Sequence, residues 1–265
     1  VEQMIRVAAG EELKIRQKVV MLKGWAVESR IYAEDPYRNF LPSTGRLVKY
    51  QPPAQTMEAA MPVPEGGGVR VDTGVYEGGE IPMYYDSMIA KLIVHGLDRD
   101  DAIRKMREAL NAFVIRGVSS NIPFQSALLA HPKFVAGDFN TGFIAENYPK
   151  GFSAALVPHD DPDFLLLLAT AAHRRMRERA SRITGQLPGH ELQVGEDFVA
   201  VLTDEQGQRR QTPVRVTNGD GSYRVTIGGK TSTLRFAGPL RDIAVSGEID
   251  GRPFVAQIER IGLHY

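Results

Sequence analysis

The sequence contains no cysteine, which excludes disulfides, thiolate nucleophiles and thiolate metal ligands. It also has no excess of either charge, because 32 basic side chains balance 32 acidic ones, so no global field would hold nucleic acid or an anionic membrane. No apolar run is long enough to span a bilayer. The chain starts at Val1 without a charged and apolar leader, which favours a fragment and shows no targeting peptide. We therefore expect a soluble, folded chain that binds neither nucleic acid nor membrane.

The length of 265 residues favours two domains, which we place at 1–150 and 151–265. In the first, alternating or apolar segments predict strands at 25–32, 46–50, 69–75 and 88–95. Asp98 is typical of an N-cap and begins a predicted helix with apolar residues at helical spacing. The Pro/Gly-rich segment 52–68 is predicted to be a mobile surface loop.

The second domain begins with a strongly marked helix, predicted at 162–184. Asp161 and Pro162 are typical of an N-cap and a first helical residue, and five arginines follow near the other end. Segment 164–172 is apolar on nearly every side, so we expect the helix to be enclosed. From 191 to 265 the period becomes two, with turn signals between the segments. An antiparallel barrel wrapped around a long central helix would enclose the helix and leave no open strand edge, so we predict this fold, of class α+β.

Common catalytic motifs are not found in the sequence. The six histidines lack the close pairing of a metal site, and the glycine clusters lack a following Lys-Ser/Thr. No serine occupies a Gly-x-Ser-x-Gly elbow, and no paired carboxylates stand out. We therefore predict no metal site within this chain.

Four segments carry a resemblance to a known family: ESRIYAEDPYRNFLPSTGRL at 28–47, VRVDTGVYEGGEIPMYYDSMIAKLIVHG at 69–96, FVIRGVSSNI at 113–122 and FVAGDFNTGFIAENYP at 134–149. Together they resemble the C-terminal part of biotin carboxylase domains over about the first 150 residues. With the helix and barrel that follow, the chain is similar to the α subunits of propionyl-CoA carboxylases. The second domain then resembles the domain, called BT, that docks the carboxyltransferase β subunit.

This resemblance implies a biotin-dependent carboxylase, a ligase that forms carbon–carbon bonds. The complete subunit would carboxylate biotin with ATP and bicarbonate, and the partner subunit would transfer the carboxyl group to propionyl-CoA, giving methylmalonyl-CoA. The implied partners are the biotin carboxyl carrier domain and the β subunit, which would bind 151–265, within a hetero-oligomer expected to be a dodecamer. The implied location is the cytoplasm in a bacterium or the mitochondrial matrix in a eukaryote.

The same resemblance assigns three residues to the biotin pocket. Arg30 matches the arginine that faces the ureido oxygen of biotin and stabilises negative charge there, so it is also the catalytic residue; from the sequence alone it would be a solvated strand arginine. Phe40 matches a phenylalanine near the biotin ring, with simple packing as the alternative. Asp86 matches an aspartate beside the pocket, with a turn-forming role as the alternative.

Departures from the family pattern limit what the chain can do alone. The segments for ATP binding, with their ligands for Mg²⁺ or Mn²⁺, and the NxRxQVEH segment are absent. The lysine that carries biotin is also absent, since Glu58–Pro62 resembles its hairpin only superficially. We expect this chain by itself to hydrolyse no ATP.

Other interpretations remain open. The chain could belong to a carboxylase for 3-methylcrotonyl-CoA, geranyl-CoA or longer acyl-CoAs, or act as a non-catalytic assembly module. The barrel could instead be an oligonucleotide-binding fold, although its aromatic residues are spread one per strand rather than gathered on a basic face. The arginines at the end of the predicted helix could contact the partner, or could be solvated and favoured by the helix dipole.

Overall fold

The computed structural model describes residues 1–265 except 59–60, 158–160, 204–206 and 263. The α-helices are α1 Glu2–Ala8, α2 Arg99–Ala112, α3 Ile122–Ala130, α4 Pro132–Ala136, α5 Phe143–Asn147 and α6 Pro162–Ser181. The strands of the first part are β1 Trp25–Tyr32, β2 Glu34–Asp35, β3 Leu41–Pro42, β4 Gly45–Arg46, β5 Lys49–Gln51, β6 Gly68–Thr73, β7 Glu80–Ile81, β8 Met88–Gly96 and β9 Val114–Arg116. Those of the second part are β10 Asp197–Thr203, β11 Arg209–Gly219, β12 Ser222–Ile227, β13 Lys230–Phe236, β14 Ala244–Ile249 and β15 Arg252–Gln257. The α+β class is confirmed.

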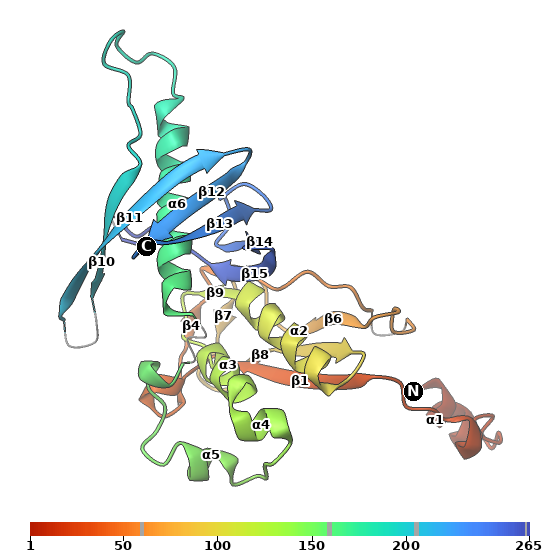
Figure 1. Cartoon of the computed structure of the whole chain (residues 1–265). Coiled ribbons are helices and arrows are strands. Elements are labelled where there is room, and N and C mark those ends of the chain that lie inside the picture. The colour runs from red at the N-terminus through yellow and green to blue at the C-terminus, as the bar shows by residue number, and fades with distance from the viewer. Residues whose placement is uncertain (59–60, 158–160, 204–206, 263) are drawn as a thin grey trace.

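The first part is built on a three-stranded antiparallel sheet in the order β1–β8–β6, with α2 packed on one face (Figure 1). Leu92 and Val94 of β8 point into this core, where they meet Met106 and Leu110 of α2, and all four are fully buried. Asp98 caps α2 by accepting a hydrogen bond from the Asp101 amide at 2.9 Å. The predicted N-cap and the strands at 25–32, 69–75 and 88–95 are confirmed, with small shifts at their ends.

The strand predicted at 46–50 is wrong as a single element. The backbone amide of Leu47 bonds to Gly79, whereas that of Val48 bonds to Arg116. The segment therefore changes its pairing partner in the middle, from β7 on one side to β9 on the other. Two short strands, β4 and β5, result.

The second part is a six-stranded antiparallel sheet that curves around α6 (Figure 1). Its strands pair in simple sequence order from β10 to β15, each with its neighbours in the chain. Leu167 and Leu168 of α6 pack against Val216 and Val225 of the sheet in one buried cluster. The predicted helix within β-structure is thus present, and Asp161 caps it as expected, but α6 ends at Ser181 rather than at residue 184.

The predicted closure of the barrel is wrong, because among the described strands β10 and β15 are unpaired edges. A wall about 10 Å from the helix axis has a circumference of about 60 Å, whereas six strands about 4.8 Å apart cover only about half of it. The sheet is therefore a half-barrel. In consequence α6 is not enclosed on all sides. Leu165, on the open side of the helix, is 54% exposed.

Strand parity also places the valines of β10 on the outer face. Phe198 pairs with Val214, whose side chain is buried, so Phe198 faces α6. Val199 and Val201 consequently point outward and are 60% and 53% exposed. Their apolar character alone did not indicate the core face.

Polar side chains join the two parts across their boundary; we call the group of Arg116, Gln257 and Glu259 the latch. Gln257, at the end of β15, donates to the carbonyl oxygens of Asn111 and Phe113 at 3.1 and 3.0 Å. These carbonyls lie at the C-terminal end of α2, where helical backbone acceptors lack intrahelical partners. Arg116 donates to Gln257 at 3.0 Å and pairs with Glu259 at 2.7 Å. A side chain of the second part thus caps a helix of the first.

Two leucines of α6 offer a test of the half-barrel. Leu168→Ala is expected to lower the free energy of unfolding by about 2–5 kcal/mol, because it leaves a cavity at a side chain that is 2% exposed. The matched change Leu165→Ala should cost about 0.5 kcal/mol or less, since that side chain already faces the open side. Urea denaturation of both variants measures the difference, and equal losses would contradict this arrangement.

Candidate functional site

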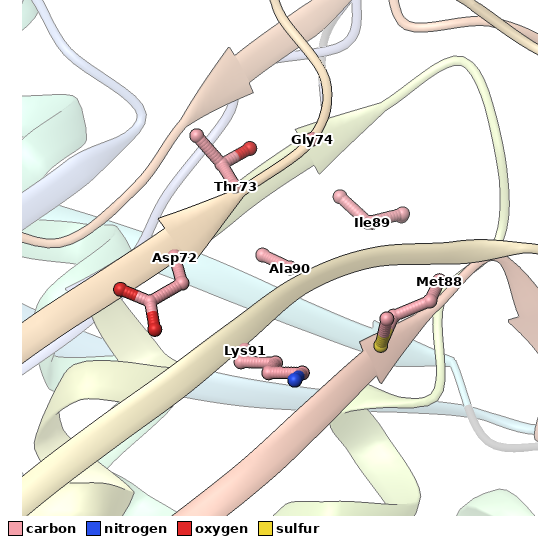
Figure 2. A pocket seen from close by; sticks show the side chains of 7 residues that line it. All are labelled: Asp72, Thr73, Gly74, Met88, Ile89, Ala90 and Lys91. Atoms are coloured by element: carbon pink, nitrogen blue, oxygen red, sulfur yellow. The ribbon is translucent and has the colours of Figure 1, made fainter. Parts of the chain in front are cut away.

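Arg30 lies in the C-terminal half of β1, on the sheet face opposite α2. Its partner across the strands is Lys91 of β8, which is in turn paired with Asp72 of β6, so three charged residues follow one another across the sheet. Figure 2 shows Asp72 and Lys91 among the residues that line a small pocket of about 230 Å³ at this place. Like charges directly opposite each other are unfavourable; here Asp72 lies opposite Lys91 and Glu28 pairs with Arg30, so each cation has an acidic neighbour.

The guanidinium of Arg30 interacts with residues of its own strand, β1. It forms an ion pair with Glu28 at 3.2 Å, and its side chain is 59% exposed. The Glu28 carboxylate, followed by the Tyr32 hydroxyl, raises the pKa of Arg30 above its already high ordinary value. The side chain is therefore a permanent, solvent-accessible cation that can approach a ligand.

The backbone around Arg30 is held by two amide side chains that we did not select from the sequence. Asn121 donates to the Arg30 carbonyl oxygen at 3.0 Å and accepts from the Tyr32 amide at 3.0 Å. Gln125 donates to the same carbonyl oxygen at 3.1 Å and accepts from Ser29. Asn121 lies in the segment 113–122 that carried the family resemblance, which was the one available signal.

Phe40 belongs to an aromatic cluster. Its ring meets that of Phe124 edge-on at 4.9 Å, and Phe124 also contacts Tyr148 and Phe152. Phe40 has a positive φ of 58°, which is rare for a bulky residue and orients the ring at the end of a short turn. This packing is what the alternative interpretation expects; a place beside the biotin ring stays a prediction.

Asp86 forms the turn that precedes β8. Its carboxylate accepts a hydrogen bond from the Met88 amide at 3.2 Å, as the alternative interpretation expects. The structure also brings Asp86 close to Glu34, a pair of carboxylates that the sequence did not reveal. Burial, and after it the charge of Asp86, raises the pKa of Glu34 above its ordinary value of 4.5.

The three predicted biotin-pocket residues are not joined by direct contacts. Within the described ranges, no hydrogen bond or ion pair connects Arg30 with Phe40 or Asp86. Asp86 nevertheless lies in the turn that leads into β8, the strand paired with β1, and Tyr32 of β1 lies opposite Met88 of β8. A shared pocket for the three remains a prediction.

The described part of the chain offers neither a cluster of metal ligands nor a helix suited to a membrane. There, no group of three or more His, Asp or Glu side chains could hold a metal ion. None of the described helices combines the length and apolar character needed to cross a bilayer. In the segment resembling a biotin hairpin, Ala59 and Ala60 lie outside the described residues.

Two of the arginines toward the C-terminal end of α6 make contacts within the chain. Arg174 pairs with Glu178 at 2.7 Å, is 11% exposed and donates to the Gly195 carbonyl. Arg175 lies over the Phe236 ring, 5.3 Å from its centroid. Arg174 and Arg175 are therefore held within the chain rather than simply solvated, whereas Arg177 and Arg179 are exposed; a partner contact for these arginines stays a prediction.

Family comparisons divide the chain as the fold does. Residues 28–146 match the biotin carboxylase C-terminal domain, and residues 165–265 match the propionyl-coenzyme A carboxylase BT domain. The chain belongs to the biotin carboxylase family of biotin-dependent carboxylases and carries a BT domain after its biotin carboxylase part.

The individual relatives are more specific. The propionyl-CoA carboxylase alpha chain of Ruegeria pomeroyi is 45% identical over 271 residues, which cover 98% of this chain and 39% of that protein. The mitochondrial propionyl-CoA carboxylase alpha chain of Homo sapiens is 37% identical over 250 residues, covering 92% of this chain and 32% of that one. This chain thus spans well under half the length of these curated relatives.

Two further matches cover a smaller share of the chain. Biotin carboxylase 1 of Bacillus subtilis is 48% identical over 144 residues, covering 54% of this chain and 30% of that one. A crystal structure of the biotin carboxylase subunit of pyruvate carboxylase is 37% identical, with a TM-score of 0.48, and covers 59% of this chain and 31% of that chain.

The raised pKa of Glu34 predicts a pH-dependent gain in stability on its replacement. A carboxyl whose pKa is higher in the folded state favours folding fully below its unfolded pKa, and this advantage is lost as pH rises through the folded pKa. Glu34→Gln should therefore raise Tm at about pH 7 and change it little at about pH 3.5. The exposed residue Glu12 supplies a control, Glu12→Gln, which should leave Tm unchanged at both values. A gain for Glu34→Gln at acidic pH alone would contradict the assignment.

Proposed function

We propose that this chain is part of the α subunit of a propionyl-CoA carboxylase. The complete subunit carboxylates biotin with ATP and bicarbonate, and a carboxyltransferase β subunit then converts propionyl-CoA to methylmalonyl-CoA. The observation that carries the proposal is the succession of a biotin carboxylase C-terminal domain and a BT domain along one chain. A biotin carboxylase match alone would not separate this enzyme from others, because Biotin carboxylase 1 of Bacillus subtilis is also 48% identical over 144 residues.

In this proposal Arg30 faces the ureido oxygen of biotin. Its permanent charge and its exposed position on the sheet suit the stabilisation of negative charge that develops on that oxygen. Phe40 and Asp86 would complete the pocket. Biotin supplies the nitrogen that accepts the carboxyl group. ATP, with Mg²⁺ or Mn²⁺, and the lysine that carries biotin belong to parts of the subunit outside these residues, so residues 1–265 alone are expected to hydrolyse no ATP.

The role of Arg30 can be tested in the complete α subunit with free biotin. Arg30→Ala is expected to lower biotin-dependent ATP hydrolysis by about 100- to 1000-fold, as for other groups that stabilise a developing oxyanion. Arg224→Ala, which removes an exposed arginine of β12 on the outer face of the half-barrel, should leave the rate unchanged. Wild-type rates in Arg30→Ala, or ATP hydrolysis by residues 1–265 alone, would overturn these assignments.

We further propose that residues 151–265 dock the β subunit in a hetero-oligomer, for which a dodecamer is the expected form. Leu167→Pro breaks α6 at a buried position and is expected to abolish co-purification of the complete α subunit with the β subunit, while biotin-dependent ATP hydrolysis persists. Leu167→Met preserves the volume and should retain the complex. An intact complex with a broken helix would mean that docking occurs elsewhere.

The acyl group is assigned to propionyl-CoA on the similarity to propionyl-CoA carboxylase alpha chains. The alternatives are 3-methylcrotonyl-CoA, geranyl-CoA and longer acyl-CoAs, or an assembly role without catalysis. Values of kcat/KM measured on the reconstituted enzyme with each acyl-CoA decide among them, because selection is expected to reside in the β subunit. The proposed location is bacterial cytoplasm or mitochondrial matrix, according to the source.

A further inference from the structure

The outer edge of β1 is completed by a side chain instead of a strand. Among the described strands, β1 is the edge of its sheet and pairs only with β8. On the other side, the Asn121 amide N–H donates to the Tyr32 carbonyl at 3.2 Å. Its side chain accepts from the Tyr32 N–H and donates to the Arg30 carbonyl, both at 3.0 Å. One residue thus reproduces the hydrogen bonds that a neighbouring strand would make.

Asn121 makes these bonds instead of the one that its position favours. It is the N-cap of α3, where asparagine side chains commonly accept a hydrogen bond from the first helical turn, but its side chain makes no such bond. It is also buried, with 6% of its surface exposed, so its amide would be costly to leave without partners. The Asn121 side chain therefore does not cap α3. Its hydrogen bonds attach the start of α3 to β1 instead.

A second amide acts at the same carbonyl. Gln125, one helical turn after Asn121, donates to the Arg30 carbonyl oxygen at 3.1 Å. Its side-chain oxygen accepts from the Ser29 hydroxyl at 3.2 Å, and Ser29 is 3% exposed. The carbonyl oxygen of Arg30 therefore accepts two hydrogen bonds from α3 and the residue that precedes it.

The backbone is what determines where the Arg30 guanidinium lies. Its ionic partner Glu28 and its neighbour Tyr32 both belong to β1, so these contacts travel with the strand. A displacement of β1 would move the whole charged group relative to a ligand bound by other elements. Misplacement of a reacting or stabilising group by about 1 Å can cost about 100-fold in rate.

We propose that Asn121 and Gln125 are positioning residues that hold Arg30 at the biotin site through its backbone carbonyl. This inference rests on the proposed function, because it assumes that Arg30 acts on biotin. Neither amide contacts the ligand; both act through β1.

The test uses the complete α subunit and compares two reactions. Asn121→Asp keeps the size and the acceptor for Tyr32 but removes the donor to Arg30, and Gln125→Met removes the second donor at nearly constant volume. Asn121→Asp is expected to lower kcat for biotin-dependent ATP hydrolysis by about 10- to 100-fold, and Gln125→Met by about threefold. The KM for ATP and the bicarbonate-dependent ATP hydrolysis without biotin should not change, whereas a fold defect would lower both activities together.

Two comparisons separate the possible causes. Asn147→Asp removes an equivalent amide donor, which bonds to the Phe143 carbonyl at 2.8 Å in α5, and should leave every rate unchanged. Asn121→Asp added to Arg30→Ala should have no further effect, because both act through one group.

The outcomes distinguish the inference from the function on which it rests. If Arg30→Ala itself retains wild-type rates, the assigned role of Arg30 fails. If Arg30→Ala is inactive but folded Asn121→Asp retains wild-type kcat, or loses biotin-independent hydrolysis equally, the positioning role is overturned. If the double variant is much slower than Arg30→Ala alone, Asn121 acts independently of Arg30 and the inference also fails.

Discussion

The segment from Phe113 to Asn121 is the constraint on which the arrangement of this chain depends. Phe113, 1% exposed, is buried in the core of the first part. Arg116 reaches the second part through Gln257 and Glu259. Gly117 has a positive φ, and a side-chain carbon there would approach the Arg46 carbonyl to 2.1 Å, so only glycine allows the segment to pass. Asn121 then attaches the segment to β1. Within nine residues, one stretch therefore connects the core, the second domain and the strand of the candidate catalytic arginine.

This connection links the two parts of the chain to which we assign different functions, biotin carboxylation and docking of the β subunit. In that proposal, the first part of the chain presents the biotin site while the second part docks the partner subunit. The latch of Arg116 and Gln257 restrains the BT domain against α2, and its hydrogen bonds satisfy carbonyls that the end of the helix would otherwise leave to water. The half-barrel itself leaves outward-facing valines on β10 and an open side at Leu165. The BT domain is thus held against the first part on one side and still exposes apolar surface on others.

At the candidate site, the charged groups are exposed and the buried polar groups are neutral. The exposed cation of Arg30 is placed opposite another, Lys91, and close to the polar residues of a small pocket. Burial is reserved for groups that orient the backbone, namely Ser29 and Asn121, which are uncharged and satisfied by hydrogen bonds. Keeping the charged group in water and the neutral amides inside avoids the cost of burying an ion while still defining its position. The Glu34 carboxyl is the exception, since burial and Asp86 raise its pKa.

The sequence by itself determined the α+β class, the capped helices after Asp98 and Asp161, most strands, and the two family domains, because these depend on local periodicity, capping chemistry and contiguous motifs. It also indicated Arg30, but only through the resemblance. Tertiary structure alone decided that the barrel stays half open, since closure depends on strand number against circumference, and that Val199 faces outward, since parity is set by the partner strand. It alone brought Asn121 to Arg30, 91 positions away, because an amide's partner depends on which backbone groups the fold leaves unpaired.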